Sequence, residues 1–149
     1  MSNTKKISDD LSVAGQVTPE ELQQLASEGF KSVLNLRASD EEGFLSDEQQ
    51  QAEKLGLEYA NVPLQPKQAD HELTKQAIEQ VENLPKPILI HCAGGARAGG
   101  IALIAAAIQE ELSYEEITQV AQEVGISLDQ PHLKQFLFNK HNDKHSENK

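Results

Sequence analysis

Several residue types are scarce in this sequence of 149 residues, and each scarcity excludes a class of protein. Cysteine occurs once, as Cys92, so the chain can form neither an intramolecular disulfide nor a cysteine-rich zinc site. The longest unbroken apolar run, Ile101–Ile108, is too short to span a bilayer. The first residues, MSNTKKISDD, lack the apolar segment of a signal peptide, so we expect a cytoplasmic protein without a membrane partner.

Basic residues are also scarce, because 24 Asp and Glu face 13 Lys and Arg and give a net charge of −11. Binding to duplex nucleic acid requires a basic face toward the phosphates, so we expect no nucleic-acid partner. All but two of the basic residues are lysines, and the two arginines are Arg37 and Arg97. Their rarity draws attention to both positions, because only arginine offers a planar fork of donors to an anion.

The length and the hydrophobic pattern predict a single domain with a substantial core. We expect a flexible N-terminus over 1–10, one domain over 11–138, and a polar, disordered tail over 139–149. Short apolar runs of β type alternate with amphipathic stretches, which indicates an α/β sandwich with a mostly parallel sheet flanked by helices. Strands are predicted at 11–13, 30–36, 57–64 and 88–90.

The helix boundaries follow from capping residues. Three segments carry Ser or Thr followed three residues later by Glu or Gln, which is the pattern of a capping box. These boxes start at Thr18, Ser46 and Ser113. Glycines then end the helices, and further helices are predicted over 71–83, over 97–111 and around Leu133.

The segment 88–100, with the sequence ILIHCAGGARAGG, has the arrangement of an anion-binding loop. A buried strand leads into a glycine-rich turn and then a helix, so backbone N–H groups and the positive helix end can converge on one concavity. Gly94 and Gly95 allow the backbone to approach a ligand closely. Cys92 would lie at the floor, where these groups favour the reactive thiolate, and Arg97 would grip an anionic substrate.

The second arginine, Arg37, follows the predicted strand 30–36, just as Cys92 follows the strand 88–90. Ligands of parallel α/β sheets bind beyond the carboxyl ends of the strands. If these two strands are parallel, Arg37 and Cys92 lie at the same edge, and both arginines face one pocket. The alternative is that Arg37 forms surface ion pairs with the acidic residues that follow it. For Cys92, the alternative is a small buried hydrophobe.

A general acid for the leaving group is expected on a neighbouring loop. Asp70, in the loop after the third strand, is the candidate that we favour. Its position also suits the N-cap of the helix predicted over 71–83, so both roles stay open. Other candidates are Asp40, Glu41 and Glu42, which lie in the loop beside Arg37.

The His91-Cys92 pair, the glycine-rich turn and Arg97 resemble the loop of cysteine-dependent protein phosphatases. The wider chain is similar to a bacterial dual-specificity-phosphatase-like family that also occurs fused to metallo-β-lactamase-like hydrolases. The segments that carry the resemblance are 15–22, 29–37, 56–64 and 90–97.

This resemblance implies a tyrosine-phosphatase-like fold and hydrolysis of a phosphoester in a phosphorylated protein or a small molecule. It implies that Cys92 attacks phosphorus to form a cysteinyl-phosphate while Arg97 holds the phosphate oxygens. Asp70 would protonate the leaving group, and no metal or other cofactor would be needed. The residues expected to contact the phosphate are Ala93, Gly94, Gly95, Ala96 and Arg37.

Two departures from the phosphatase pattern support alternative functions. Four residues separate Cys92 from Arg97, whereas the phosphatase pattern has five. The shorter spacing is similar to that of rhodanese-type sulfurtransferases, which carry a persulfide on the cysteine. Ala98 also stands where phosphatases usually have Ser or Thr, so a non-catalytic module that binds phosphate or a phosphoprotein is a third hypothesis.

Overall fold

The computed structural model describes residues 4–147, and it describes side chains as far as residue 139. Its strands are β1 (Lys5–Lys6), β2 (Leu11–Ala14), β3 (Ser32–Asn35), β4 (Glu58–Asn61) and β5 (Ile88–His91). Its helices are α1 (Pro19–Ser27), α2 (Glu48–Lys54), α3 (His71–Asn83), α4 (Ala96–Glu110), α5 (Tyr114–Val124) and α6 (Pro131–Glu147).

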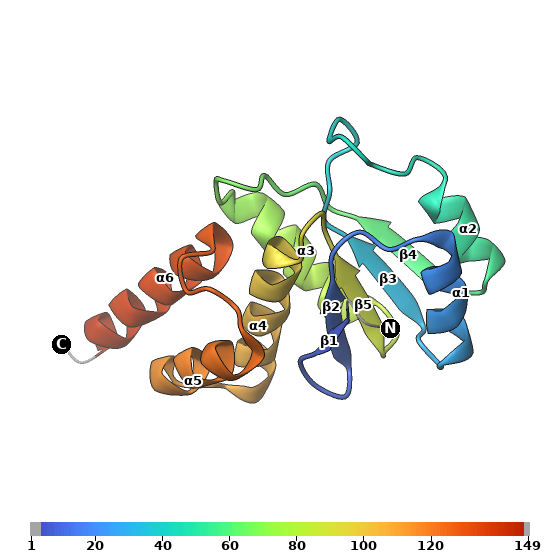
Figure 1. Ribbon diagram of the computed structural model, residues 1–149. Helices are drawn as coiled ribbons and strands as arrows, with labels where there is room; N and C mark the ends of the chain where they lie inside the picture. The colour runs from blue at the N-terminus through green and yellow to red at the C-terminus, as the bar shows by residue number, and fades with distance from the viewer. Residues whose placement is uncertain (1–3, 148–149) are drawn as a thin grey trace.

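The strands form one sheet in the order β1-β2-β5-β3-β4 (Figure 1). All neighbouring strands are parallel except the short β1, which pairs antiparallel with β2. The register places Ala14, Asn35 and Asn61 in one row with His91 at the carboxyl ends of the strands. The residues that follow these positions therefore converge on a single edge of the sheet.

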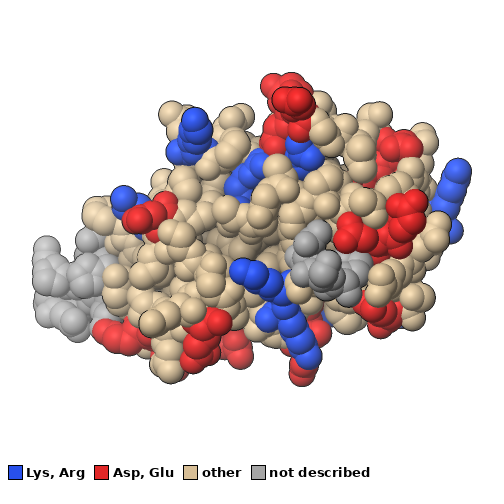
Figure 2. Space-filling model, in the orientation of Figure 1, with Lys and Arg blue, Asp and Glu red and all other residues tan. Residues whose placement is uncertain are grey.

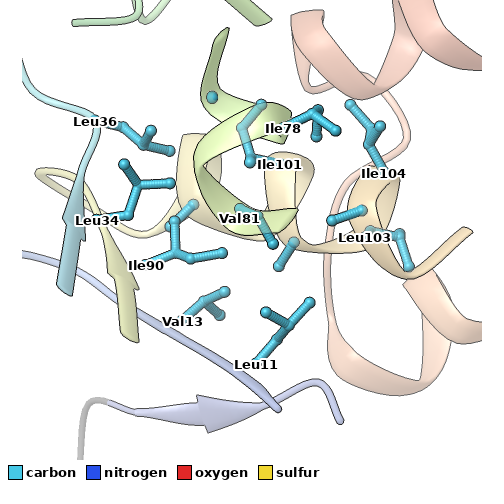
Figure 3. Packing of buried hydrophobic residues seen from close by; sticks show 14 of the residues in the cluster. Leu11, Val13, Leu34, Leu36, Ile78, Val81, Ile90, Ile101, Leu103 and Ile104 are labelled. Carbon is cyan, nitrogen blue, oxygen red and sulfur yellow. The ribbon is translucent and has the colours of Figure 1, made fainter. Parts of the chain in front are cut away.

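Helices cover both faces of the sheet (Figure 1). On one face, α1 and α2 enclose a small apolar cluster that includes Leu22, Leu25 and Val33. On the other face, α3 and α4 pack over the larger core, part of which Figure 3 shows. Helix α4 is buried from Arg97 through Ala107, because α3, α5 and α6 pack against it. A helix that is apolar on all sides is expected in such a central place.

The predicted α/β class and the mostly parallel sheet are confirmed. The helix predicted over 71–83 coincides with α3, and the capping boxes at Thr18 and Ser113 are present. The third predicted box, at Ser46, is wrong. Asp47 is the N-cap of α2 without a side-chain bond to the backbone.

The two ends of the chain differ from the prediction. Lys5–Lys6 forms β1 inside the segment 1–10, which we expected to be flexible. Helix α6 continues to Glu147, although the sequence predicts a disordered tail from residue 139. No glycine or proline follows Pro131, so nothing in the backbone stops the helix from propagating. Among the described residues, no helix is long and apolar enough to cross a membrane.

Candidate active site

The loop between β5 and α4 surrounds the sulfur of Cys92. The Cys92 side chain is fully buried, and its Sγ accepts hydrogen bonds from the backbone N–H of Gly95 at 3.1 Å and of Ala98 at 3.5 Å. Gly95 has φ +100°, a left-handed conformation that glycine adopts without a steric penalty. The turn therefore aims N–H groups at the sulfur, and such donors stabilise a thiolate.

The neighbouring chain holds this loop in place. Gln16 donates its backbone N–H to the carbonyl of Ala93 at 3.1 Å, and Cys92 donates to the carbonyl of Ala14 at 3.3 Å. Gly15 lies so close that a Cβ there would be 2.8 Å from the Ala93 oxygen. The segment after β2 thus packs directly on the cysteine loop.

Arg97 is in the first turn of α4 and is 4% exposed. Its Nη1 donates to the carbonyls of Leu64 at 2.8 Å and Leu36 at 3.3 Å. Nη1 and Nη2 also bind the two carboxylate oxygens of Glu41, at 2.8 and 3.0 Å. These partners fix the plane of the guanidinium group and engage its Nη1 and Nη2 edge.

Glu41 joins the two arginines. Besides its bidentate contact with Arg97, it accepts a hydrogen bond from Nε of Arg37 at 3.2 Å and from the N–H of Ala38 at 2.7 Å. Arg97 in the first place, together with Ala38 and Arg37, lowers the pKa of Glu41 to about 2 against the opposing effect of burial. Glu41 is therefore ionised at neutral pH, and in this conformation it holds the arginines rather than offering a proton.

Arg37 is also 4% exposed, so it is not a surface arginine. Its Nη1 donates to Oε1 of Gln16 at 2.7 Å, and its Nη2 donates to the carbonyl of Glu42. Both readings made from the sequence thus hold in part. Arg37 pairs with an acidic residue of the following loop, and it also lines the same cavity as Cys92.

That cavity has a volume of about 450 Å³ and opens over the cysteine loop. Figure 2 shows acidic and basic side chains close together at the upper edge of the molecule, where the loop after β3 lies. Of the predicted contact residues, Gly95 is absent from the wall, although its N–H reaches the sulfur. The wall consists of Arg37, Glu41, Glu42, Pro66, Cys92, Ala93, Gly94, Ala96 and Arg97.

A buried contact between His91 and Glu48 beneath the loop is a feature that the sequence reasoning missed. Nε2 of His91 lies 2.5 Å from Oε2 of Glu48, and both side chains are at most 1% exposed. The other ring nitrogen of His91, Nδ1, lies 3.4 Å from the carbonyl of Cys92. The contact with Glu48 holds the ring of His91 in one orientation directly beside the cysteine.

The contact between His91 and Glu48 is connected to the arginines through one glutamine, Gln16. Nε2 of Gln16 donates to Oε1 of Glu48 at 2.8 Å, while Oε1 of Gln16 accepts from Arg37. Tyr59 is near the same carboxylate, and its pKa is raised by burial and by the charge of Glu48. A chain of contacts therefore runs from His91 through Glu48, Gln16, Arg37 and Glu41 to Arg97. No local pattern in the sequence signalled this pairing, because Glu48 and His91 are 43 residues apart.

Asp70 is the N-cap of α3, where its Oδ1 accepts a hydrogen bond from the N–H of Leu73 at 3.0 Å. It is exposed and is not part of the cavity wall. Pro66 of the same loop does line the cavity. The capping role is thus present, and the role of Asp70 as a general acid stays a prediction.

No group of three or more His, Cys, Asp or Glu side chains among the described residues is arranged to hold a metal ion.

A family model, the phosphatase-like domain of beta-lactamase hydrolase-like proteins, matches residues 3–109. The chain belongs to this family. A beta-lactamase hydrolase-like protein of Agrobacterium fabrum is 26% identical over 129 residues. The match covers 83% of this chain but 29% of that protein, so the chain spans less than a third of its curated relative.

Solved structures share the fold of this phosphatase-like domain. A candidate phosphatase from Shewanella putrefaciens has a TM-score of 0.78 and 17% identity, with 95% of this chain and 92% of that chain covered. TpbA of P. aeruginosa, solved in complex with phosphotyrosine, has a TM-score of 0.69 and 14% identity, with 91% and 82% covered. The predicted tyrosine-phosphatase-like fold is therefore confirmed.

Proposed function

We propose that the protein hydrolyses phosphoesters through a covalent intermediate on Cys92. The thiolate would attack phosphorus in line with the leaving oxygen, so that an S–P bond forms as the P–O bond breaks. A general acid would give the leaving oxygen its proton. Water would then attack the cysteinyl-phosphate, releasing inorganic phosphate and restoring the thiolate.

The observation that carries this proposal is the meeting of Cys92 and Arg97 in one cavity. The N–H groups of Gly95 in the loop and of Ala98 in α4 point at the sulfur, and Arg97 lines the same cavity from the first turn of α4. Donors held in place before the reaction stabilise the charge that develops on a transferring phosphoryl group. Membership of a phosphatase-like family supports the same chemistry.

The two arginines would contact the phosphate in different ways. Glu41 and two carbonyls occupy the Nη1 and Nη2 edge of Arg97, so Glu41 would orient the guanidinium group and leave its Nε edge for the phosphate. Arg37 would add positive charge at the wall. The substrate-binding residues that we propose are Ala93, Gly94, Gly95, Ala96 and Arg37.

The substrate class that we propose is a phosphorylated protein or a small phosphoester. The structural neighbour TpbA, which binds phosphotyrosine, supports an aryl phosphate as the first substrate to test. Inorganic phosphate and vanadate are suitable probes of the substrate site, because both have the oxygens that Arg97 and the loop between β5 and α4 would bind.

Asp70 remains the proposed general acid, and Glu42 is a second candidate because it lines the cavity. Asp70→Ser separates the two roles of Asp70, since serine is also a good N-cap but cannot supply a proton at neutral pH. If Asp70 is the acid, kcat should fall by about 10²–10⁴-fold while stability is retained. Unchanged kcat in Asp70→Ser together with a loss in Glu42→Gln would assign the acid to Glu42.

The decisive experiment is a paired assay of wild type and Cys92→Ser. Wild type should hydrolyse p-nitrophenyl phosphate and form a phosphoenzyme that mass spectrometry locates on Cys92, whereas Cys92→Ser should do neither. If wild type binds phosphate or a phosphopeptide tightly but shows no turnover, the protein is a phosphate-binding module. If wild type neither turns over substrate nor binds vanadate, the proposal is wrong.

A sulfurtransferase is the second candidate, and the short loop favours it. Four residues separate Cys92 from Arg97, and one of them, Gly95, donates its N–H to the sulfur at 3.1 Å. Here the thiolate would take the outer sulfur of thiosulfate, releasing sulfite, and then pass it to cyanide as thiocyanate. Thiosulfate treatment should leave one added sulfur on Cys92 if this candidate is right. Absence of that adduct in an active phosphatase would exclude it.

A further inference from the structure

A second cavity lies on the helical side of the molecule, away from the cysteine loop. Helices α3 and α6 both pack on α4, and the groove between them has a volume of about 390 Å³. Ile78, Ile104, Ile108 and Phe136 line it. Figure 3 shows Ile78 and Ile104 at the edge of the core cluster that borders this groove. A volume of this size is in the range of small-molecule sites.

Two buried polar atoms at this groove have no partner. His132 lines the groove and is 1% exposed, yet its Nε2 has no hydrogen bond, and neither has Oγ1 of Thr74 on the opposite wall. Buried polar atoms are almost always paired, so two orphans in one cavity point to a missing ligand.

The orphan nitrogen of His132 is a donor. Gln130 accepts from the N–H of Leu133 through Oε1, so its Nε2 is the group that faces Nδ1 of His132, at 2.7 Å. Nδ1 must therefore accept, which leaves the ring proton on Nε2. Burial, with a further contribution from Arg97, lowers the pKa of His132, so the neutral ring with this tautomer is present at neutral pH. The missing partner of His132 is thus a hydrogen-bond acceptor.

The groove has a polar end and an apolar remainder. Helices α3 and α4 both start at the carboxyl edge of the sheet and run away from it, because each follows a parallel strand. His71, Thr74 and Lys75 belong to the first turns of α3, near this edge. His132 is at the same end, because its neighbour Gln130 packs against Gly100, where a Cβ would be 2.1 Å from the glutamine oxygen.

The charges differ between the two ends. Lys75 and His71 line the groove at the end that holds the orphan atoms, whereas Glu79 and Glu82 line it farther along α3. An anionic head is therefore favoured at the first end and disfavoured at the second. The isoleucines and Phe136 would cover an apolar tail between them.

We propose that this groove binds a small single-chain amphiphile with a carboxylate head. The head would accept hydrogen bonds from Nε2 of His132 and from the hydroxyl of Thr74, near the charge of Lys75. The tail would lie along Ile78, Ile104 and Ile108. This site is separate from the cysteine cavity and does not depend on the phosphatase proposal.

The test uses decanoate, below its micelle concentration, as the probe. The full chain is labelled with ¹⁵N and observed by NMR, including the ring nitrogens of His132. Decanoate should shift the Nε2 signal of His132 and the amides around Thr74 in a saturable manner, in wild type and in Cys92→Ser alike. Decyltrimethylammonium, which has the same tail and a cationic head, should not. Acetate controls for simple anion binding at the cysteine loop.

Two variants sharpen the test. His132→Phe should weaken decanoate binding by about tenfold, the effect of one lost hydrogen bond. Because a buried substitution can unfold the protein, exposed Lys75→Gln is the second variant, and it should weaken binding about three- to fivefold. Lys54→Gln, on the other side of the molecule, is the matched control and should bind as wild type does.

The proposal is overturned if decanoate leaves the His132 ring signals unchanged or shifts only residues 92–97. It is also overturned if the cationic amphiphile binds as well as decanoate, since that would show a nonspecific apolar surface. Phosphatase activity has no part in these readouts, so a failure here leaves the proposed function intact, and the reverse is equally true.

Discussion

Two loops meet above Cys92, and they are held by different means. The short loop between β5 and α4 is fixed by backbone hydrogen bonds and is packed closely by Gly15, where a Cβ would lie 2.8 Å from the Ala93 oxygen. The longer loop after β3 is fixed mainly by one carboxylate, Glu41, which bridges two arginines and the N–H of Ala38. The position of the Cys92 sulfur is therefore fixed by the backbone of the fold, while the residues around it are held by charge. Substitutions and pH should affect the two loops differently.

The largest effect on stability is expected at Glu48, which follows the long loop. Glu48 contacts His91 of β5, the strand that leads into the short loop. Glu48→Ala removes the partner of His91 and leaves a buried imidazole without its carboxylate. Removing one partner of a buried pair destabilises a protein by about 3–5 kcal/mol. Urea unfolding should show this loss of unfolding free energy. Glu53→Ala, an exposed position on the same helix, should change it by less than about 0.5 kcal/mol. Equal stability of the two variants would mean that the pair contributes nothing.

The short loop is tested by Arg97→Lys. Lysine keeps the charge but not the fork that Glu41 and the carbonyls hold, so phosphate would lose an oriented donor. We expect kcat/KM toward an aryl phosphate to fall by about 10²–10³-fold with little loss of secondary structure by circular dichroism. Arg37→Lys is the matched change on the long loop and should have a smaller effect. A larger loss in Arg37→Lys would reverse the assigned roles of the two arginines.

The long loop is tested by Glu41→Gln, in combination with pH. The pKa of Glu41 is about 2 in the folded chain and near 4.5 in the unfolded chain. Its ion pairs therefore stabilise the fold fully above pH 4.5. That contribution is lost as the pH falls from about 4.5 to 2. Wild type should lose on the order of 1–2 kcal/mol of unfolding free energy in this range through Glu41.

In the Glu41→Gln variant this part of the pH dependence should be absent, while Glu28→Gln, an exposed control, should behave as wild type does. Activity near neutral pH gives a second readout of the same variant. Glu41→Gln should lower phosphate affinity if Glu41 orients Arg97. Tighter phosphate binding would instead mean that the carboxylate competes with the substrate for the arginine.

The smallest effect on stability is expected at Asp70, the N-cap of α3. Asp70→Ala removes the hydrogen bond to the N–H of Leu73 and should cost about 1 kcal/mol of unfolding free energy. Asp70→Ser should recover most of this loss. No recovery in the serine variant would contradict the capping role, whatever the effect on catalysis.

The same contrast explains what could be predicted from the sequence. The short loop was predictable because its parts are adjacent in the chain, and a strand, a cysteine, glycines and an arginine appear there in order. Helix α3 was also predictable, since its cap and its end are local signals.

The roles of Glu41, Glu48 and Gln16 were not predictable in this way. Only the pairing of Glu41 with Arg37, four residues away, was among the alternatives that the sequence offered. The other contacts join residues that are 21 to 56 positions apart, so only the folded sheet brings them together. The capping box predicted from Ser46 and Gln49 is absent, because α2 begins at Glu48 after Asp47, and Glu48 pairs with His91 of β5 instead of a nearby residue.

The place of β5 in the sheet has a consequence for how the protein is made. This strand lies between β2 and β3, yet it is the last of the five to be synthesised. Until residue 88 leaves the ribosome, β2 and β3 both present unpaired edges with no common neighbour, and a stable sheet has to wait. Since Cys92 follows this closing strand directly, a growing chain acquires its proposed nucleophile only as the sheet is completed.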